Sequence, residues 1–212
     1  MKQKHFIDIH KGVTGLFVVF LMFILNQWNN TVGWIYFALH GSYGIMWILK
    51  SRIFPDSSWE KPCSIWYGLY IWFGLSLYWI SPWIILTGYF SNGIPIQLSP
   101  QYIAFCIFIF SIGVFFHFSA DMQKYCYLEL RPNQLISTGM MKKCRNINYF
   151  GELLIYLGFS LLASHWLPIV ALSLFIVIIW IPNIVRKEKS LSRYSDFDDY
   201  RNNSSLIFPF IY

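Results

Sequence analysis

The sequence predicts an all-α integral membrane protein with about six transmembrane helices and with both termini in the cytoplasm. The first observation is composition, because 56% of the 212 residues are hydrophobic and only 12% are charged, whereas a soluble domain carries about 25% charged residues. The second is a series of long apolar runs separated by short polar links. The third is that all 16 Lys and Arg residues fall in only a few of those links.

The first two apolar runs cover residues 12–25 and 32–49, and an uncharged link joins them. Each is long enough for one transmembrane helix when its flanking turns are included. The first run lacks a small-residue cleavage site, so we expect a membrane anchor. The third run, residues 63–90, is interrupted by Pro82. Proline breaks helical hydrogen bonding, so this run is compatible with one kinked helix or with one helix plus a re-entrant segment.

The remaining runs lie on either side of a long polar segment. The fourth run covers residues 102–120, and we expect its helix to continue past Asp121. The fifth run begins near Tyr149 and is short, and a tight turn at residues 164–168 joins it to a sixth run that ends near Ile184. Runs five and six are therefore expected to form a helical hairpin.

The cations are confined to residues 1–11, 50–61, 121–148 and the tail after Ile184. With six spans these four segments lie on one side of the membrane, which the positive-inside rule assigns to the cytoplasm. The net charge of +6 is then a topology signal, aided by anionic lipid headgroups, and no nucleic-acid partner is expected. The four cysteines show no metal-ligand spacing, and no glycine-rich dinucleotide motif is present. We expect no metal site and no Rossmann domain.

Residues 121–152 form the most polar internal stretch and end in a carboxylate, Glu152, that opens an apolar run. Charged groups at a membrane edge are costly and often mark functional sites. The cations in this stretch can bind phosphate groups, and its carboxylates and amides can bind ribose hydroxyls or a carboxamide. The alternative is a solvated loop whose charges only set topology.

The segment CRNINYFGELLIYLG, residues 144–158, resembles the C-terminal signature of the steroid 5-alpha-reductase family, most closely its short bacterial members. The similarity runs from His117 to Tyr212 and includes SAD at 119–121, N-x-x-G-E at 148–152 and the terminal LIFPFIY. That family is related to the isoprenylcysteine and phospholipid methyltransferases. Many relatives read Arg-His-Pro-Asn-Tyr where this chain has Arg-Asn-Ile-Asn-Tyr at 145–149.

The resemblance implies an oxidoreductase of the bacterial inner membrane that uses NADPH to reduce a carbon–carbon double bond conjugated to a carbonyl. Its substrate would be a sterol-like or other lipid. Within one membrane domain, residues 1–116 would form the substrate side and residues 117–212 would hold the cofactor. The cofactor-binding residues would be His117, Asp121, Lys124, Arg131, Arg145, Asn148, Tyr149, Glu152 and Arg186. Steroid-reducing members use a glutamate on an early helix, and the first two runs contain no Glu or Asp, so a steroid substrate is not supported.

Reduction of an enone also needs a proton donor near the carbonyl oxygen. Tyr43 is our candidate acid and His40 its partner, since they lie about one helical turn apart on one face. The alternative is a tyrosine at a helix interface and a histidine that bridges helices.

Two other functions are compatible with the sequence. One is an S-adenosylmethionine-dependent membrane methyltransferase, and the other is a non-catalytic membrane protein that keeps only the fold. The missing His-Pro pair weighs against the methyltransferase, and the cluster of cations favours a polyphosphate cofactor over a sulfonium. We also expect the tail segment with Tyr200 and Phe208–Phe210 to fold back over the cofactor site.

Overall fold

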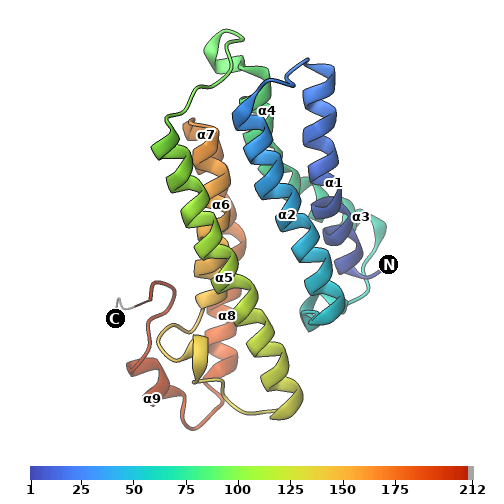
Figure 1. The fold of residues 1–212 in the computed structure, drawn as a ribbon. Helices are drawn as coiled ribbons and strands as arrows, with labels where there is room; N and C mark the ends of the chain where they lie inside the picture. The colour runs from blue at the N-terminus through green and yellow to red at the C-terminus, as the bar shows by residue number, and fades with distance from the viewer. Residues whose placement is uncertain (210–212) are drawn as a thin grey trace. The chain divides into compact units, whose positions relative to one another are not determined.

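The computed structural model describes residues 1–209, and these contain helices and no β-strand. Five helical stretches are long and apolar enough to cross a membrane, and a further apolar helix has 16 residues. This confirms an all-α integral membrane protein, with five full-length candidate spans plus one short helix where about six spans were predicted. The α-helices are α1 (Gln3–Ile24), α2 (Thr31–Ile53), α3 (Ile65–Ser76), α4 (Ile80–Thr87), α5 (Pro100–Leu130), α6 (Ile147–Leu162), α7 (Trp166–Phe175), α8 (Ile181–Leu191) and α9 (Phe197–Asn202) (Figure 1).

Helix α1 begins at Gln3, nine residues before the first apolar run. The helical flank of the first apolar run therefore takes in most of the polar N-terminal segment. Ile7, Lys11, Thr14 and Val18 are all buried, and their spacing of four, three and four residues is that of one helix face. The pattern was hidden because one of its members is a lysine.

The third apolar run is one candidate span and not two segments, and it is helical from Ile65 to Thr87, where the left-handed Gly88 ends the helix. It contains α3, a 3-10 turn at Leu77–Trp79 and α4. Pro82 has no N–H group, so the carbonyl of Tyr78 loses its usual helical donor. The hydroxyl of Tyr36 on α2 donates to that carbonyl at 3.2 Å. A side chain from a neighbouring helix thereby replaces the hydrogen bond that the proline removes.

A second proline interrupts the last long span. Residues Ile176–Trp180 form a π-helical turn between α7 and α8, just before Pro182.

Helix α5 has 31 residues and is about 46 Å long at 1.5 Å per residue. That length exceeds a hydrocarbon core of about 30 Å. The end of α5 at Leu130 confirms that this helix continues past Asp121.

The chain divides into two compact units. The first unit comprises Met1–Phe110 and Tyr156–Leu172, and the second comprises Ser111–Ile155 and the chain from Ser173 onward. In the first unit, the N-terminal Lys2 and Lys4 pair with Glu60 in the link after α2. In the second unit, the polar 121–148 segment binds the C-terminal tail. Within each unit the cationic segments therefore lie together, as the charge pattern predicted.

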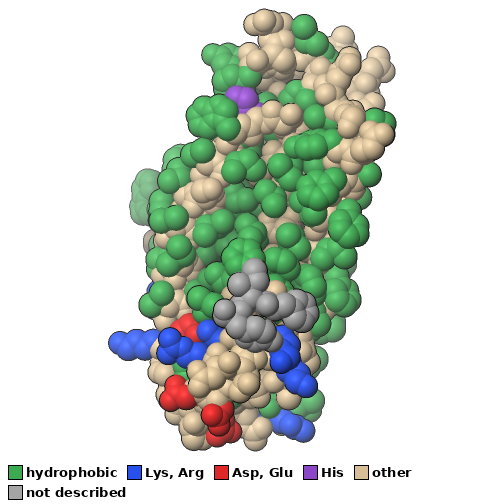
Figure 2. Space-filling model, turned by 90° about the vertical axis from the view of Figure 1, so that its left-hand side faces the viewer, with side chains coloured by type: hydrophobic (Ala, Val, Ile, Leu, Met, Phe, Trp, Pro, Cys, Tyr) green, Lys and Arg blue, Asp and Glu red, His purple; other side chains and the backbone are tan. Residues whose placement is uncertain are grey.

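The outer surface is strongly apolar. On the face drawn in Figure 2, hydrophobic side chains cover most of the surface and charged side chains gather at one end. Leu16, Trp66 and Phe73 are 71%, 80% and 72% exposed. Such exposure of large apolar side chains is expected where a helix faces lipid.

Candidate functional site

The polar centre of the second unit is built on one face of α5. His117, Asp121 and Lys124 follow one another at spacings of four and three residues, so they project from the same side of the helix. His117 and Asp121 are buried. Asn148, at the start of α6, donates from Nδ2 to Oδ1 of Asp121 at 3.2 Å, and its backbone carbonyl accepts from Nδ1 of His117 at 3.2 Å. The structure therefore brings three predicted site residues into one cluster.

Two glycines allow α5 and α6 to come close enough for these bonds. A Cβ on Gly151 would lie 2.4 Å from the backbone N of His117 and 2.7 Å from the carbonyl oxygen of Gly113. A Cβ on Gly113 would lie 2.6 Å from the carbonyl oxygen of Gly151. Real side chains do not tolerate such distances. Gly151, in the N-x-x-G-E core, thus serves the contact between helices.

Helix α8 contributes Lys187 to this cluster. Its Nζ donates to the carbonyl of Arg145 at 2.8 Å and to Oδ1 of Asn146 at 2.9 Å. Lys187 also interacts electrostatically with Lys124 and Asp121 on α5. The ammonium group therefore lies at the polar centre, although the sequence had singled out its neighbour Arg186.

Arg186 itself points away from the cluster. It is exposed, and its guanidinium donates to the carbonyl of Pro182 and to the side chain of Asn183 on its own helix. Neighbouring residues on a helix are about 100° apart, so only one of the pair could share a face with buried Ile184. The sequence pattern could show which residues of α8 share a face, but it could not show which part of the chain packs against that face.

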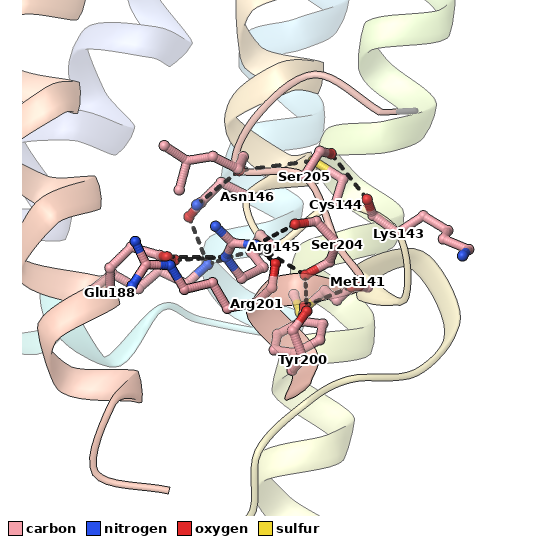
Figure 3. A network of polar contacts seen from close by, with 12 residues as sticks. Met141, Lys143, Cys144, Arg145, Asn146, Glu188, Tyr200, Arg201, Ser204 and Ser205 are labelled. Carbon is pink, nitrogen blue, oxygen red and sulfur yellow. Dashed lines mark hydrogen bonds and ion pairs between the residues drawn. The ribbon is translucent and has the colours of Figure 1, made fainter. Parts of the chain in front are cut away.

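Arg145 is buried and clamps the tail (Figure 3). Its Nε donates to both carboxylate oxygens of Glu188 at 3.2 and 3.0 Å. Its Nη1 donates to the carbonyl of Arg201 at 3.1 Å and to the carbonyl and hydroxyl of Ser204. Arg145 was predicted to contact phosphate, and in the structure its guanidinium is hydrogen-bonded to Glu188, Arg201 and Ser204 instead.

The tail folds back onto residues 141–146. Backbone N–H groups of Arg145 and Asn146 donate to the carbonyls of Ser205 and Leu206 at 3.0 and 3.1 Å. The hydroxyl of Tyr200 donates to the carbonyl of Met141 at 2.6 Å, and burial raises the pKa of that phenol. Phe208 packs edge-on against Phe150 at 6.0 Å. The tail folds back as expected, with contacts up to Phe208. That it covers a cofactor site stays a prediction, and Phe210 lies outside the described residues.

The other predicted cofactor residues are Glu152, Tyr149 and Arg131. Glu152 is half-buried one turn after Asn148 on α6 and has no polar partner among residues 1–209. Within the same range, Oδ1 of Asn148 is buried and accepts no hydrogen bond. Tyr149 packs edge-on against Trp180 at 5.4 Å. Arg131 is exposed just beyond α5, with its guanidinium 5.7 Å from the Tyr127 ring centre.

A second polar cluster is buried in the first unit. Nζ of Lys11 on α1 donates to the hydroxyl of Tyr43 at 2.7 Å and to that of Tyr156 at 3.1 Å. The same ammonium lies 3.5 Å from a ring centre of Trp47. Lys11 is only 4% exposed and Tyr43 is fully buried. A lysine in a span costs about 2.5–3.5 kcal/mol, and these phenol and cation–π contacts offset that cost.

The rings of Tyr43 and His40 meet edge-on with their centres 6.2 Å apart, and a catalytic partnership between them stays a prediction. His40 is buried, but its Nδ1 bonds the hydroxyl of Tyr36 at 2.9 Å, and its ring stacks on Phe159 at 4.2 Å. The hydroxyl of Tyr43 accepts a hydrogen bond from Lys11, which had been grouped with the basic N-terminal residues. Gly44 permits this contact, because a Cβ there would lie 2.3 Å from the Lys11 carbonyl oxygen.

The comparisons with known proteins place the chain in a family but assign it no activity. No curated protein sequence matches it. The profile of DUF1295, described as a protein of unknown function, matches residues 1–205. Because this match covers nearly the whole chain, the protein belongs to the DUF1295 family.

Proposed function

We propose that this protein is an NADPH-dependent membrane oxidoreductase that reduces a carbon–carbon double bond conjugated to a carbonyl in a lipophilic substrate. The observation that carries the proposal is the pair of acceptor groups left open on α6. Oδ1 of Asn148 is buried without a donor, and Glu152 has no polar partner among residues 1–209. A buried acceptor without a donor costs about 1–3 kcal/mol, so a ligand that donates hydrogen bonds there is favoured.

The surrounding charges fit a phosphorylated nucleotide. Lys187 interacts electrostatically with Lys124 and with Asp121, the carboxylate that Asn148 bonds. Lysine ammonium groups bind phosphate as point charges. The carboxamide and ribose hydroxyls of a nicotinamide nucleotide are donors for Asn148 and Glu152. The resemblance of residues 148–152 to the steroid 5-alpha-reductase family supports the same cofactor. A cationic sulfonium such as S-adenosylmethionine suits this cluster less well.

Bound NADPH would supply the hydride for the β-carbon of the substrate. The chain's own contribution is then to hold the nucleotide and to supply a proton. Tyr43 is the proposed proton donor in the first unit. The Lys11 ammonium, 2.7 Å from its hydroxyl, stabilises the negative charge that remains on the phenol oxygen after it donates. Tyr156, 3.4 Å from the hydroxyl of Tyr43, can share the proton.

The test is to purify the protein in mild detergent and identify the nucleotide that remains bound by mass spectrometry. We expect NADP(H) with the wild type and loss of retention in Asn148→Ala and Glu152→Gln. The matched control is Glu129→Gln, which neutralises an exposed carboxylate at the end of α5. Thermal unfolding of all three variants checks that the bundle is intact.

Each other outcome points to a different function. Bound S-adenosyl compounds would favour the methyltransferase. Wild-type retention of NADP(H) by the folded Asn148→Ala and Glu152→Gln variants would refute the site. The absence of any bound nucleotide, together with no binding of added NADPH, would refute the proposed function itself.

A further inference from the structure

A hollow in the second unit is separate from the polar cluster proposed to bind the nucleotide. It has a volume of about 390 Å³ and is bounded by α8, α9, Arg145 and Leu206. This volume lies in the range of ligand pockets, about 300–1,000 Å³. The hollow is therefore large enough for a small ligand or for the headgroup of a larger one.

The hollow carries a surplus of positive charge. Arg145 is balanced by Glu188, whose carboxylate lies 3.0 Å from its Nε. Lys189 and Arg201 also line the hollow. Both are exposed, and their side chains have no polar partner within residues 1–209. Two unbalanced cations on opposite helices favour an anion between them.

One wall of the same hollow is apolar. Ile184, Val185 and Leu206 line it, and Val185 is 60% exposed. Ile181, one turn earlier on α8, is also exposed, and residues four apart share a helix face. The apolar stretch of this span ends at Val185, where Arg186 begins the charged part of α8. The hollow thus lies at the boundary between the apolar and charged parts of its helix.

We infer that this hollow binds the headgroup of an anionic phospholipid. The phosphate lies between Lys189 and Arg201, and an acyl chain follows Val185 and Ile181 along α8. Basic pockets at the cytoplasmic ends of transmembrane helices are suited to such headgroups, because anionic lipids are enriched in that leaflet. A soluble phosphate would use the two cations but not the apolar wall. The inference does not depend on the proposed reductase activity.

Binding at this position would also stabilise the docked tail. Arg201 belongs to α9, and its carbonyl accepts a hydrogen bond from Arg145. The adjoining Ser204 is held by the same guanidinium. A lipid that holds Arg201 therefore reduces opening of residues 200–206.

The test uses the full chain in phosphatidylcholine nanodiscs with or without phosphatidylglycerol. The wild type is compared with the double variant Lys189→Gln/Arg201→Gln. The matched control is Lys142→Gln/Arg193→Gln, which removes the same charge from exposed cations outside the hollow. The readouts are bound phosphatidylglycerol, by native mass spectrometry, and amide exchange of residues 200–206. Equal unfolding midpoints in phosphatidylcholine alone establish that both variants fold.

We expect the wild type and the control to retain phosphatidylglycerol. The hollow variant, which lacks both cations that face the phosphate, should lose about thirtyfold of its affinity. Protection of residues 200–206 by phosphatidylglycerol should disappear in the hollow variant alone. Equal loss in both double variants would overturn the inference in favour of a general charge effect. Protection by inorganic phosphate or NADPH as strong as that by phosphatidylglycerol would assign the hollow to a soluble phosphate. Neither outcome would bear on the nucleotide test with Asn148 and Glu152.

Discussion

Replacing Gly151 by alanine tests the close approach of α5 and α6 on which the candidate nucleotide site depends. The new Cβ would lie 2.4 Å from the backbone N of His117, and ordinary contact begins at 3.4 Å. The two helices must therefore separate by about 1 Å at this point. The opposing atoms are backbone and not flexible side chains, so the strain cannot be relieved by a rotamer change.

The separation would break the hydrogen bonds around Asn148. Both of its bonds, to Asp121 and to His117, are 3.2 Å long, and a further ~1 Å takes them beyond bonding distance. Each lost bond costs about 1 kcal/mol and overpacking adds about 1–3 kcal/mol, so we expect about 3–5 kcal/mol of destabilisation in total. In a chain of this size that lowers the unfolding midpoint by roughly 10 °C.

Thermal unfolding in detergent and retention of nucleotide measure the two effects. The matched control is Gly74→Ala in α3, where no atom of residues 1–209 outside the adjoining helix backbone lies within 4 Å of the new Cβ. Alanine there should be neutral or stabilising by up to about 1 kcal/mol, because glycine is the weaker helix former. An unfolding midpoint for Gly151→Ala equal to that of Gly74→Ala would refute the close-approach argument.

Four further results are expected. Lys11→Met should leave the unfolding midpoint unchanged or raise it, since an apolar side chain of similar size replaces a buried charge. The same variant should reduce turnover of a lipophilic enone by about 100-fold, and unchanged turnover would exclude a role for Lys11 in proton donation. Gly44→Ala should destabilise the first unit by about 1–3 kcal/mol, because its Cβ meets the Lys11 carbonyl at 2.3 Å, and a wild-type midpoint would contradict this. Arg145→Lys should raise amide exchange of residues 200–206, since lysine cannot reproduce the guanidinium bonds to Glu188 and Ser204; unchanged exchange would refute the clamp. Hydrogen bonds from Lys2 and then from Lys4 lower the pKa of Glu60. The contact between the N-terminus and residue 60 should therefore hold at pH 7 and open as the pH falls below about 4, where the carboxylate is protonated. Amide exchange at Gln3, corrected for intrinsic rates, measures this opening.

The sequence was sufficient for the class of protein and for most of its helices. Apolar length and charge placement depend on composition along the chain, and lipid imposes helices on any apolar span. The continuation of α5 past Asp121 and the shortness of α6 followed from the same reasoning. The face shared by His117, Asp121 and Lys124 was not predicted, although helix periodicity could have shown it. The apolar run of α1 left out its first nine residues, because polar and charged side chains, among them the buried Lys11, interrupt the apolar pattern there.

The tertiary structure decided which polar groups meet. Lys11 reaches Tyr43 only because Gly44 lets α1 approach α2. Lys187 and not Arg186 joins the polar cluster because Ile184 sets the buried face of α8. Arg145 is taken up by Glu188 and Ser204, which lie 43 and 59 residues away in the chain. Contacts between distant segments depend on how helix faces pack, and local sequence patterns specify the faces without specifying their partners. The chain by itself thus fixed the membrane helices and their polar faces, and packing between helices decided the partner of each polar side chain.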